Sequence, residues 1–181
     1  MKEVYIFSNK YIFETLLKIK GYDLSGARKF IKNLELLNIK ELSEWRLRKR
    51  WEIVQFHYEN NTCFRKKVGR KIISKWESLP IITKSDFQRP MDEILTTGFS
   101  KSKVYISSTS GSSGHPFFFA KDKFTHALTW ANIEQRYKSI GINIGDSEAR
   151  FYGIPKEPKY YYFEKCKDFI LNRYRFSIFD L

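Results

Sequence analysis

Few residues of this sequence are of the kinds that build disulfide frameworks or metal sites. Its 181 residues include two cysteines, Cys63 and Cys166, which lie far apart and form no Cys-x-x-Cys spacing. Its three histidines, His57, His115 and His126, form no metal-binding pattern. The sequence therefore indicates neither a disulfide-stabilised secreted domain nor a zinc site, and we assign no metal ligand.

Long apolar runs are also missing. Lys2, Glu3 and Lys10 place charges early in the chain, so we expect no secretory signal peptide. The longest uncharged stretch, residues 104–120, is too polar to span a bilayer. These features predict a cytoplasmic protein.

Basic residues are in clear excess over acidic ones. Lys and Arg number 33 against 20 Asp and Glu, which gives a net charge of +13. Such a charge favours polyanions, namely nucleotide phosphates, nucleic acid or an anionic membrane surface. A solvated basic surface without such a partner is an equally good interpretation, because no compact nucleic-acid motif accompanies the charge. The hydrophobic content of 42% and the aromatic content of 17% indicate a globular protein.

Residues 1–103 are predicted to be mainly helical. Gly21 is expected to end the first helix, and Ser43 to cap the start of the third. Thr83 and Asp86 have the spacing of a capping box, which predicts a further short helix. Apolar residues at helical spacing predict three longer helices, over residues 2–20, 25–40 and 42–60.

Two segments of this helical region concentrate positive charge. Arg46–Arg50 contains four basic residues, and residues 65–75 contain six. A polyanion-binding patch is one interpretation. A solvated helix face is the simpler one, and we favour it for Arg46–Arg50.

Residues 104–181 are predicted to combine strands with helix. Asp122 is expected to cap a helix that ends before Gly141. A turn at Gly145–Asp146 and a strand over 149–154 are expected to follow.

The aromatic run Tyr160–Phe163 is expected to lie in the core or in a strand rather than to form a ligand site. Together these patterns predict a mixed α/β fold. The length suits one domain spanning residues 1–181.

The most distinctive stretch lies between two apolar runs that we expect to form buried strands. Val104–Ile106 enters it and Phe117–Ala120 leaves it, while Ser107–Pro116 between them is rich in serine and glycine. Gly111 and Gly114 allow the backbone to approach a ligand closely. Hydroxyls and backbone N–H groups without a carboxylate suit a phosphate chain. A flexible linker is the other interpretation of this composition, but the run is short and its flanks are apolar.

The order Thr-Ser-Gly-Ser-Ser-Gly-x-Pro over Thr109–Pro116 resembles the phosphate loop of the adenylate-forming enzymes, which include acyl-CoA synthetases, luciferase-like ligases and peptide-synthetase adenylation domains. His115 fills the variable position and Phe117 follows the proline, where members of the family often carry Lys. The P-loop of nucleotide hydrolases is excluded, because no Lys follows the second glycine. The resemblance implies a set of phosphate-binding residues: Thr109, Ser110, Gly111, Ser112, Ser113 and Gly114.

The resemblance also implies an activity. Adenylate-forming enzymes use ATP and Mg²⁺ to activate a carboxylate as an acyl-adenylate, and many then transfer the acyl group to CoA. In the family the adenine pocket, the acidic Mg²⁺ ligand and the catalytic Lys lie further along the chain. Their counterparts are expected beyond Leu181, so this chain is expected to carry the phosphate loop but not the full catalytic set.

Three further segments narrow the resemblance to the phenylacetate–CoA ligase-like proteins and their relatives in capsular polysaccharide biosynthesis. His57–Arg65, Leu79–Asp86 and Gly141–Asp146 are similar to segments of that branch in the same order. Tyr58 and Cys63 differ from its usual small residue and proline. The resemblance implies a helical N-terminal region and then, over 104–181, the start of a layered sheet-and-helix large domain, here incomplete. It also implies a role in capsule or surface polysaccharide synthesis.

Two alternatives to a ligase stay open. The chain can be a basic polyanion-binding module for nucleic acid or an anionic membrane, or a truncated remnant without function. For the ligase interpretation the expected partners are a nucleotide, a carboxylate substrate, and a missing C-terminal half or second polypeptide.

Overall fold

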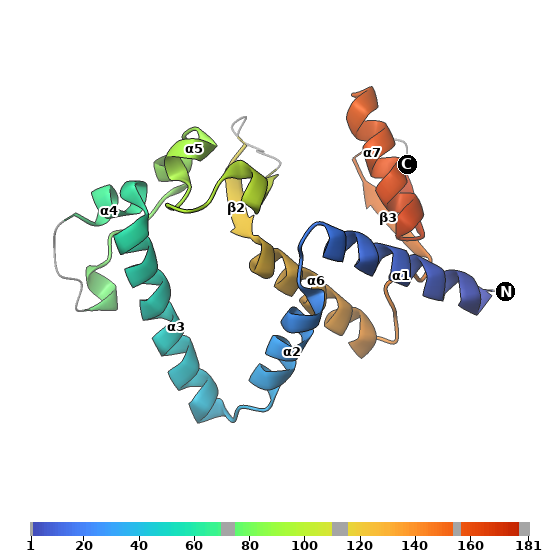
Figure 1. Ribbon diagram of the computed structural model, residues 1–181, viewed down its shortest axis with the longest axis horizontal. Coiled ribbons are helices and arrows are strands. Elements are labelled where there is room, and N and C mark those ends of the chain that lie inside the picture. The colour runs from blue at the N-terminus through green and yellow to red at the C-terminus, as the bar shows by residue number, and fades with distance from the viewer. Residues whose placement is uncertain (1, 70–74, 110–115, 154–156, 178–181) are drawn as a thin grey trace. The chain divides into compact units, whose positions relative to one another are not determined.

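The computed structural model describes residues 2–69, 75–109, 116–153 and 157–177 (Figure 1). It confirms the prediction of a mixed α/β fold, with more helix than strand and two small sheets. The chain divides into two compact units. The first unit comprises Met1–Ile31 and Ala127–Leu181, and the second comprises Lys32–His126.

The first unit is built around the helices α1 (Lys2–Ile19), α2 (Leu24–Glu35) and α6 (Lys123–Ser139). Ala27 and Ala127 have no exposed surface. Side chains this small let neighbouring helices approach closely and leave little room for larger residues. They belong to one cluster of buried residues: Phe13, Leu17, Leu24, Ala27, Ala127, Ala131, Ile144 and Leu171.

An ion-pair network ties the three helices of this unit together. Arg28 on α2 donates from Nε to Glu134 Oε2 on α6 at 2.7 Å, and its guanidinium also pairs with Glu14 on α1. Lys138 Nζ lies 3.1 Å from Glu134 Oε1. Burial acts to raise the pKa of the Glu134 carboxyl, but the hydrogen bonds from Arg28 and Lys138 outweigh it and lower that pKa. The carboxylate is therefore held ionised inside the unit.

The first unit also contains a strand–helix–strand segment. β3 (Glu148–Tyr152) pairs in parallel with β4 (Arg173–Ser177), and α7 (Pro158–Ile170) connects them. Arg175 donates from Nε to Asp168 Oδ2 of α7 at 2.7 Å. On the opposite face of the sheet the rings of Phe151 and Phe176 stack with centroids 5.4 Å apart. The predicted strand over 149–154 is confirmed as far as Tyr152, and its last residue lies outside the described residues.

The prediction for Tyr160–Phe163 was wrong. These residues form the first turns of α7, and Tyr162 is 69% exposed. Pro158 at the start of the helix has a fixed φ that favours helix initiation. Four consecutive side chains cannot all face one side of a helix, so most of this run points away from the core.

Helices α3 (Ile39–Asn60) and α4 (Thr62–Val68) begin the second unit. Asn38, not the predicted Ser43, caps α3, because its side-chain oxygen accepts from the Glu41 amide at 3.0 Å. The Glu41 carboxylate accepts from the Asn38 amide in return, so the helix begins before residue 42. The helix predicted over 25–40 accordingly ends at Glu35.

Short elements follow, and the predicted capping box is among them. Thr83 and Asp86 bracket the start of η2, as their spacing indicated. The Thr83 amide and hydroxyl both donate to Asp86 Oδ2, at 2.7 and 2.8 Å. The short helices of this part are η1 (Trp76–Ser78), η2 (Lys84–Phe87), α5 (Met91–Ile94) and η3 (Lys101–Lys103).

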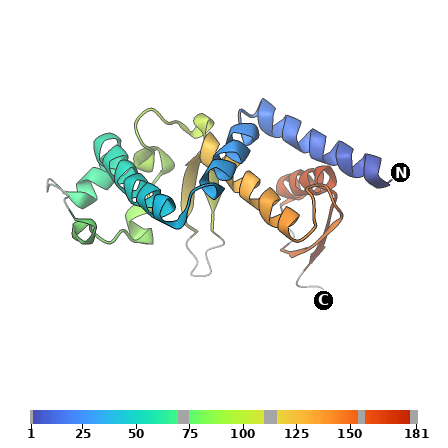
Figure 2. The same ribbon diagram turned by 90° about the horizontal axis from the view of Figure 1, so that it is seen from below.

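The second unit ends in an antiparallel hairpin of β1 (Val104–Ser108) and β2 (Phe118–Asp122). Figure 2 shows the two strands side by side. They are strands as predicted, but they are half-buried rather than buried, and Phe118 is 51% exposed. The Thr125 amide donates to Asp122 Oδ1 at 2.6 Å, which confirms Asp122 as the cap of α6.

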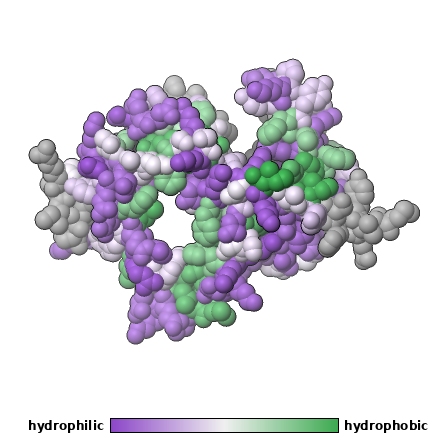
Figure 3. All heavy atoms as spheres, in the orientation of Figure 1, coloured by the Kyte–Doolittle hydropathy of each residue, from purple (hydrophilic) through white to green (hydrophobic). Residues whose placement is uncertain are grey.

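Apolar side chains also reach the surface of both units, where Figure 3 shows them beside more numerous hydrophilic ones. Ile39, Ile81 and Phe169 are each more than 70% exposed. In the part of the chain that the structure describes, the helices are too short or too polar to cross a membrane.

Candidate functional site

The two strands of the hairpin stay paired up to the start of the serine- and glycine-rich loop. The Thr109 amide donates to the Phe117 carbonyl oxygen at 3.0 Å. The Phe117 amide in turn donates to Thr109 Oγ1 at 3.2 Å. This pair extends the ladder one step past Ser108 and Phe118 and fixes the points where the loop leaves and rejoins the hairpin.

Of the six phosphate-binding residues that the sequence predicts, the structure places Thr109 at this closing pair. Its hydroxyl oxygen accepts a hydrogen bond from the Phe117 backbone amide. The remaining five lie outside the described residues: Ser110, Gly111, Ser112, Ser113 and Gly114. Their assignment stays a prediction.

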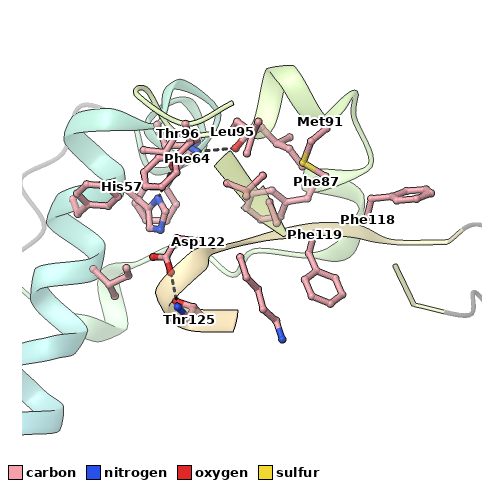
Figure 4. A pocket seen from close by; sticks show the side chains of 18 of the residues that line it. His57, Phe64, Phe87, Met91, Leu95, Thr96, Phe118, Phe119, Asp122 and Thr125 are labelled. Carbon is pink, nitrogen blue, oxygen red and sulfur yellow. Dashed lines mark hydrogen bonds between the residues drawn. The ribbon is translucent and has the colours of Figure 1, made fainter. Parts of the chain in front are cut away.

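A pocket of about 490 Å³ lies in the second unit, next to the hairpin. Figure 4 shows residues of β2, α3, α4 and the segment around α5 facing it. Phenylalanine rings make up much of its lining: Phe56, Phe64, Phe87, Phe99, Phe117, Phe118 and Phe119. Its size and apolar character are typical of small-molecule sites.

Asn61 organises the polar end of this pocket. It lies between α3 and α4, is only 4% exposed, and its Oδ1 accepts from the Phe64 amide at 2.9 Å. Its Nδ2 donates to the Ile94 carbonyl oxygen at 2.9 Å and to Thr96 Oγ1 at 3.1 Å. One side chain thus caps α4 and holds the segment after α5 against it.

His57 lies beside this group. Its Nδ1 is 3.2 Å from Thr96 Oγ1, and Figure 4 shows its imidazole at the same end of the pocket as Asp122. Burial lowers the pKa of His57, so the neutral ring is favoured near pH 7. The imidazole can therefore donate or accept a hydrogen bond here without adding positive charge.

Both charged residues of β2, Lys121 and Asp122, belong to the pocket lining, and side chains alternate along the strand. Phe118, Ala120 and Asp122 share one face of the strand, while Phe119 and Lys121 share the other. Lys121 Nζ lies 5.6 Å from the centroid of the Phe119 ring on that other face. In Figure 4 the Asp122 carboxylate lies at the end of the pocket near His57.

Cations of both basic segments make local contacts. Arg65 donates from Nε to the Tyr58 carbonyl oxygen at 2.7 Å, and Lys67 Nζ lies 2.9 Å from Asp86 Oδ1. The Thr83 amide and Lys67 hold the pKa of Asp86 at about 2. Arg65 and Lys67 therefore serve local structure. The basic residues of Arg46–Arg50 are exposed on α3, which fits a solvated helix face and a polyanion-binding patch alike, and Arg48 and Lys49 pair with Glu52.

Comparison with protein-family models, with curated proteins and with solved structures finds no match to this chain. Among the described residues, no three side chains of His, Cys, Asp or Glu gather as a metal site would require.

The pocket was not predicted from the sequence, although one of its residues, Asn61, has a recognisable local sequence pattern. Asn61 followed by Thr62 at the end of α3 is a typical N-cap sequence, and it marks the start of α4. Nothing local indicates that Asn61 also reaches Thr96, because 35 positions separate the two residues.

Proposed function

We propose that this chain supplies the ATP phosphate-binding part of an adenylate-forming ligase. The observation that carries the proposal is the placement of the sequence Thr109–Pro116. It connects two strands of an antiparallel hairpin whose ladder closes at Thr109 and Phe117. A loop anchored in this way keeps its entry and exit points fixed, which limits the entropy lost when it closes on a ligand.

The chemistry of the loop fits a polyphosphate. Its serine hydroxyls, its backbone N–H groups and its two glycines offer donors and close approach, and it contains no carboxylate to repel phosphate. In the proposed reaction a carboxylate oxygen attacks the α-phosphorus of ATP, and pyrophosphate leaves. The loop would hold the β- and γ-phosphates, and Mg²⁺ bound with ATP would neutralise part of their charge.

The narrower resemblance supports a more specific version of the proposal. His57–Arg65 corresponds to the junction of α3 and α4, and Leu79–Asp86 to the segment that ends in η2. On this basis the ligase acts in capsule or surface polysaccharide synthesis, and CoA is the acceptor to test first.

Titration with ATP and Mg²⁺ by isothermal calorimetry tests the proposal. Gly111→Ala and Ser110→Ala should each weaken binding about tenfold, because a lost or misplaced donor to a charged phosphate is costly. Ser102→Ala is the matched control, since its hydroxyl pairs with Ser100 Oγ at 3.0 Å outside the loop. Binding that responds equally to loop and control substitutions would contradict the assignment.

Polyanion binding is the competing function, and the exposed cations of Arg46–Arg50 favour it. Binding through these side chains would fall steeply as salt rises and would not distinguish ATP from RNA or anionic lipid. Repeating the titration from 50 to 200 mM salt therefore separates the two functions. Loop substitutions without effect, together with a steep salt dependence, would favour the polyanion module.

A further inference from the structure

We propose that the pocket of the second unit binds a small uncharged aromatic molecule, held by the phenylalanines of its lining. Fourteen of the twenty described residues that line it are apolar, and its volume of about 490 Å³ lies in the range of small-molecule sites. The inference goes beyond the ATP proposal, because it rests on residues of the pocket and not on the loop. It also differs from the carboxylate substrate of that proposal, since this ligand carries no charge.

Apolar side chains of the lining keep surface that a ligand can cover. Five of them are between 37% and 51% exposed: Ile53, Phe56, Ile82, Phe99 and Phe118. Removing such surface from water is favourable, so it provides a driving force for binding without any polar contact. Seven lining residues are phenylalanines, and a flat ring can stack on them or meet them edge to face. An aromatic ligand therefore gains contacts that a saturated ring of similar size does not.

The buried polar groups of the lining already bond within the protein. Asn61 is 4% exposed, and its Nδ2 donates to the Ile94 carbonyl oxygen and to Thr96 Oγ1. Its Oδ1 accepts from the Phe64 amide. The same Thr96 hydroxyl lies 3.2 Å from His57 Nδ1. Both amide hydrogens of Asn61 are thus used, and this end of the pocket holds its own shape instead of presenting donors to a charged head group.

The two charged residues of the described lining have opposite signs and contacts of their own. Asp122 Oδ1 accepts from the Thr125 amide at 2.6 Å, a bond that Figure 4 shows. Lys121 Nζ lies 5.6 Å from the centroid of the Phe119 ring. Burial lowers the pKa of His57, so its imidazole is neutral near pH 7. A charged ligand would lose its hydration among groups that already have partners, and that loss is costly.

Three probes that share one ring system test the preference for an uncharged ligand. Near pH 7, 2-naphthylmethanol is neutral, 2-naphthylmethylamine is a cation and 2-naphthoate is an anion. Ligand-observed NMR titration should show the alcohol binding about tenfold more tightly than either charged probe. A charged probe that binds as tightly as the alcohol overturns the assignment of an uncharged ligand. Failure of all three probes to bind overturns the pocket as a ligand site.

A saturated analogue tests the part played by the phenylalanine rings. Decahydro-2-naphthylmethanol keeps the head group and the two fused rings but has no aromatic face. It should bind about threefold more weakly than 2-naphthylmethanol, because it cannot make the ring–ring contacts. Equal or tighter binding of the saturated alcohol overturns the assignment of an aromatic ligand.

Phe118→Leu locates the binding in the pocket. It removes one ring of the lining but keeps an apolar side chain, and a half-exposed residue can be replaced with little effect on the fold. It should weaken 2-naphthylmethanol about fivefold. Phe151→Leu is the matched control, because Phe151 is a similarly exposed phenylalanine of the first unit, and it should leave the Kd unchanged. Equal Kd values for the two variants overturn the placement of the ligand.

Two substitutions on β2 test whether charge contributes. Lys121→Gln removes the positive charge, and Asp122→Asn removes the negative charge while keeping an oxygen to cap α6. Each should leave the Kd of 2-naphthylmethanol unchanged. Loss of its binding in both variants would mean that charged groups hold the ligand, and it would overturn the proposal.

The loop variant Gly111→Ala separates this inference from the ATP proposal. It should weaken ATP and leave 2-naphthylmethanol unaffected, because the two sites use different residues. Loss of alcohol binding in this variant would overturn an independent pocket. Loss of neither ligand would count against the loop and not against the pocket.

Discussion

The two units of this chain differ in how far they bury their apolar side chains. Among the described residues, eight of the nine buried hydrophobic side chains belong to the first unit, and Val54 alone belongs to the second. The first unit closes a core around small and aliphatic residues. The second leaves phenylalanines half-exposed around a pocket. A closed core provides stability, whereas an open apolar pocket provides space for a ligand.

The two units also differ in what their buried polar side chains hold together. In the first unit Arg28 and Glu134 form an ion pair with a carboxylate side chain that is 4% exposed. In the second unit the buried polar residues include Asn61, which bonds backbone atoms and Thr96. The first arrangement holds three helices together, and the second fixes one end of a pocket. Polar burial therefore serves packing in one unit and a candidate site in the other.

The largest expected effect comes from replacing one phenylalanine in each unit. Phe13 is 7% exposed and meets Trp130 edge to face with ring centroids 4.5 Å apart, so Phe13→Ala should lower the free energy of unfolding by about 3 kcal/mol. Phe118→Ala at the pocket should lower it by less than about 1 kcal/mol, because that ring is 51% exposed. Chemical denaturation followed by circular dichroism measures both. Equal losses of unfolding free energy in the two variants would contradict this difference between the units.

A smaller effect is expected at the hydrogen-bonded end of the pocket. Asn61→Ala removes the cap of α4 and two further hydrogen bonds, which should cost about 2 kcal/mol of stability. Asn60→Ala is the control, because its side chain is half-buried and donates to the Phe56 carbonyl oxygen of the same helix. Hydrogen exchange of the Phe64 amide should rise in the first variant and not in the second. Unchanged exchange in both would mean that Asn61 does not organise this region.

The smallest expected effect is a pH dependence confined to the second unit. Burial lowers the pKa of His57 below its ordinary value of 6.5, so the unfolded chain takes up a proton before the folded one does. Stability from this residue is therefore present above pH 6.5 and is lost as the pH falls below it. Thermal unfolding at pH 7.5 and 5.5 should show a decrease that His57→Gln reduces. The pKa of Glu134 is lowered from its ordinary value of 4.5, so this residue changes stability only at more acidic pH.

Local signals in the sequence were sufficient for several element boundaries. The capping box of Thr83 and Asp86, the cap at Asp122 and the positive φ of 76° at Gly141 all follow from chemistry within four residues. Ser43 failed as a cap because Asn38 offers a full capping box upstream. Each of these outcomes is decided by neighbours in the chain.

The remaining features depend on contacts between distant positions. The exposure of Tyr162 depends on what packs against α7, which its own sequence does not specify. The half-burial of β1 and β2 likewise depends on which elements cover the hairpin. The pocket requires His57 and Thr96, which lie 39 positions apart, to meet. Periodicity and composition carry no information about such pairs.

Asp122 is both the last residue of β2 and the cap of α6, so strand and helix share a residue without a connecting loop. Side chains alternate along a strand, and one added or deleted residue exchanges its two faces. A deletion between Phe118 and Asp122 would therefore exchange the two faces of the strand or detach the helix cap. The lining of the pocket therefore depends on the length of a five-residue strand as much as on which residues it contains. Insertions and deletions in β2 would thus alter the lining of the pocket as surely as substitutions.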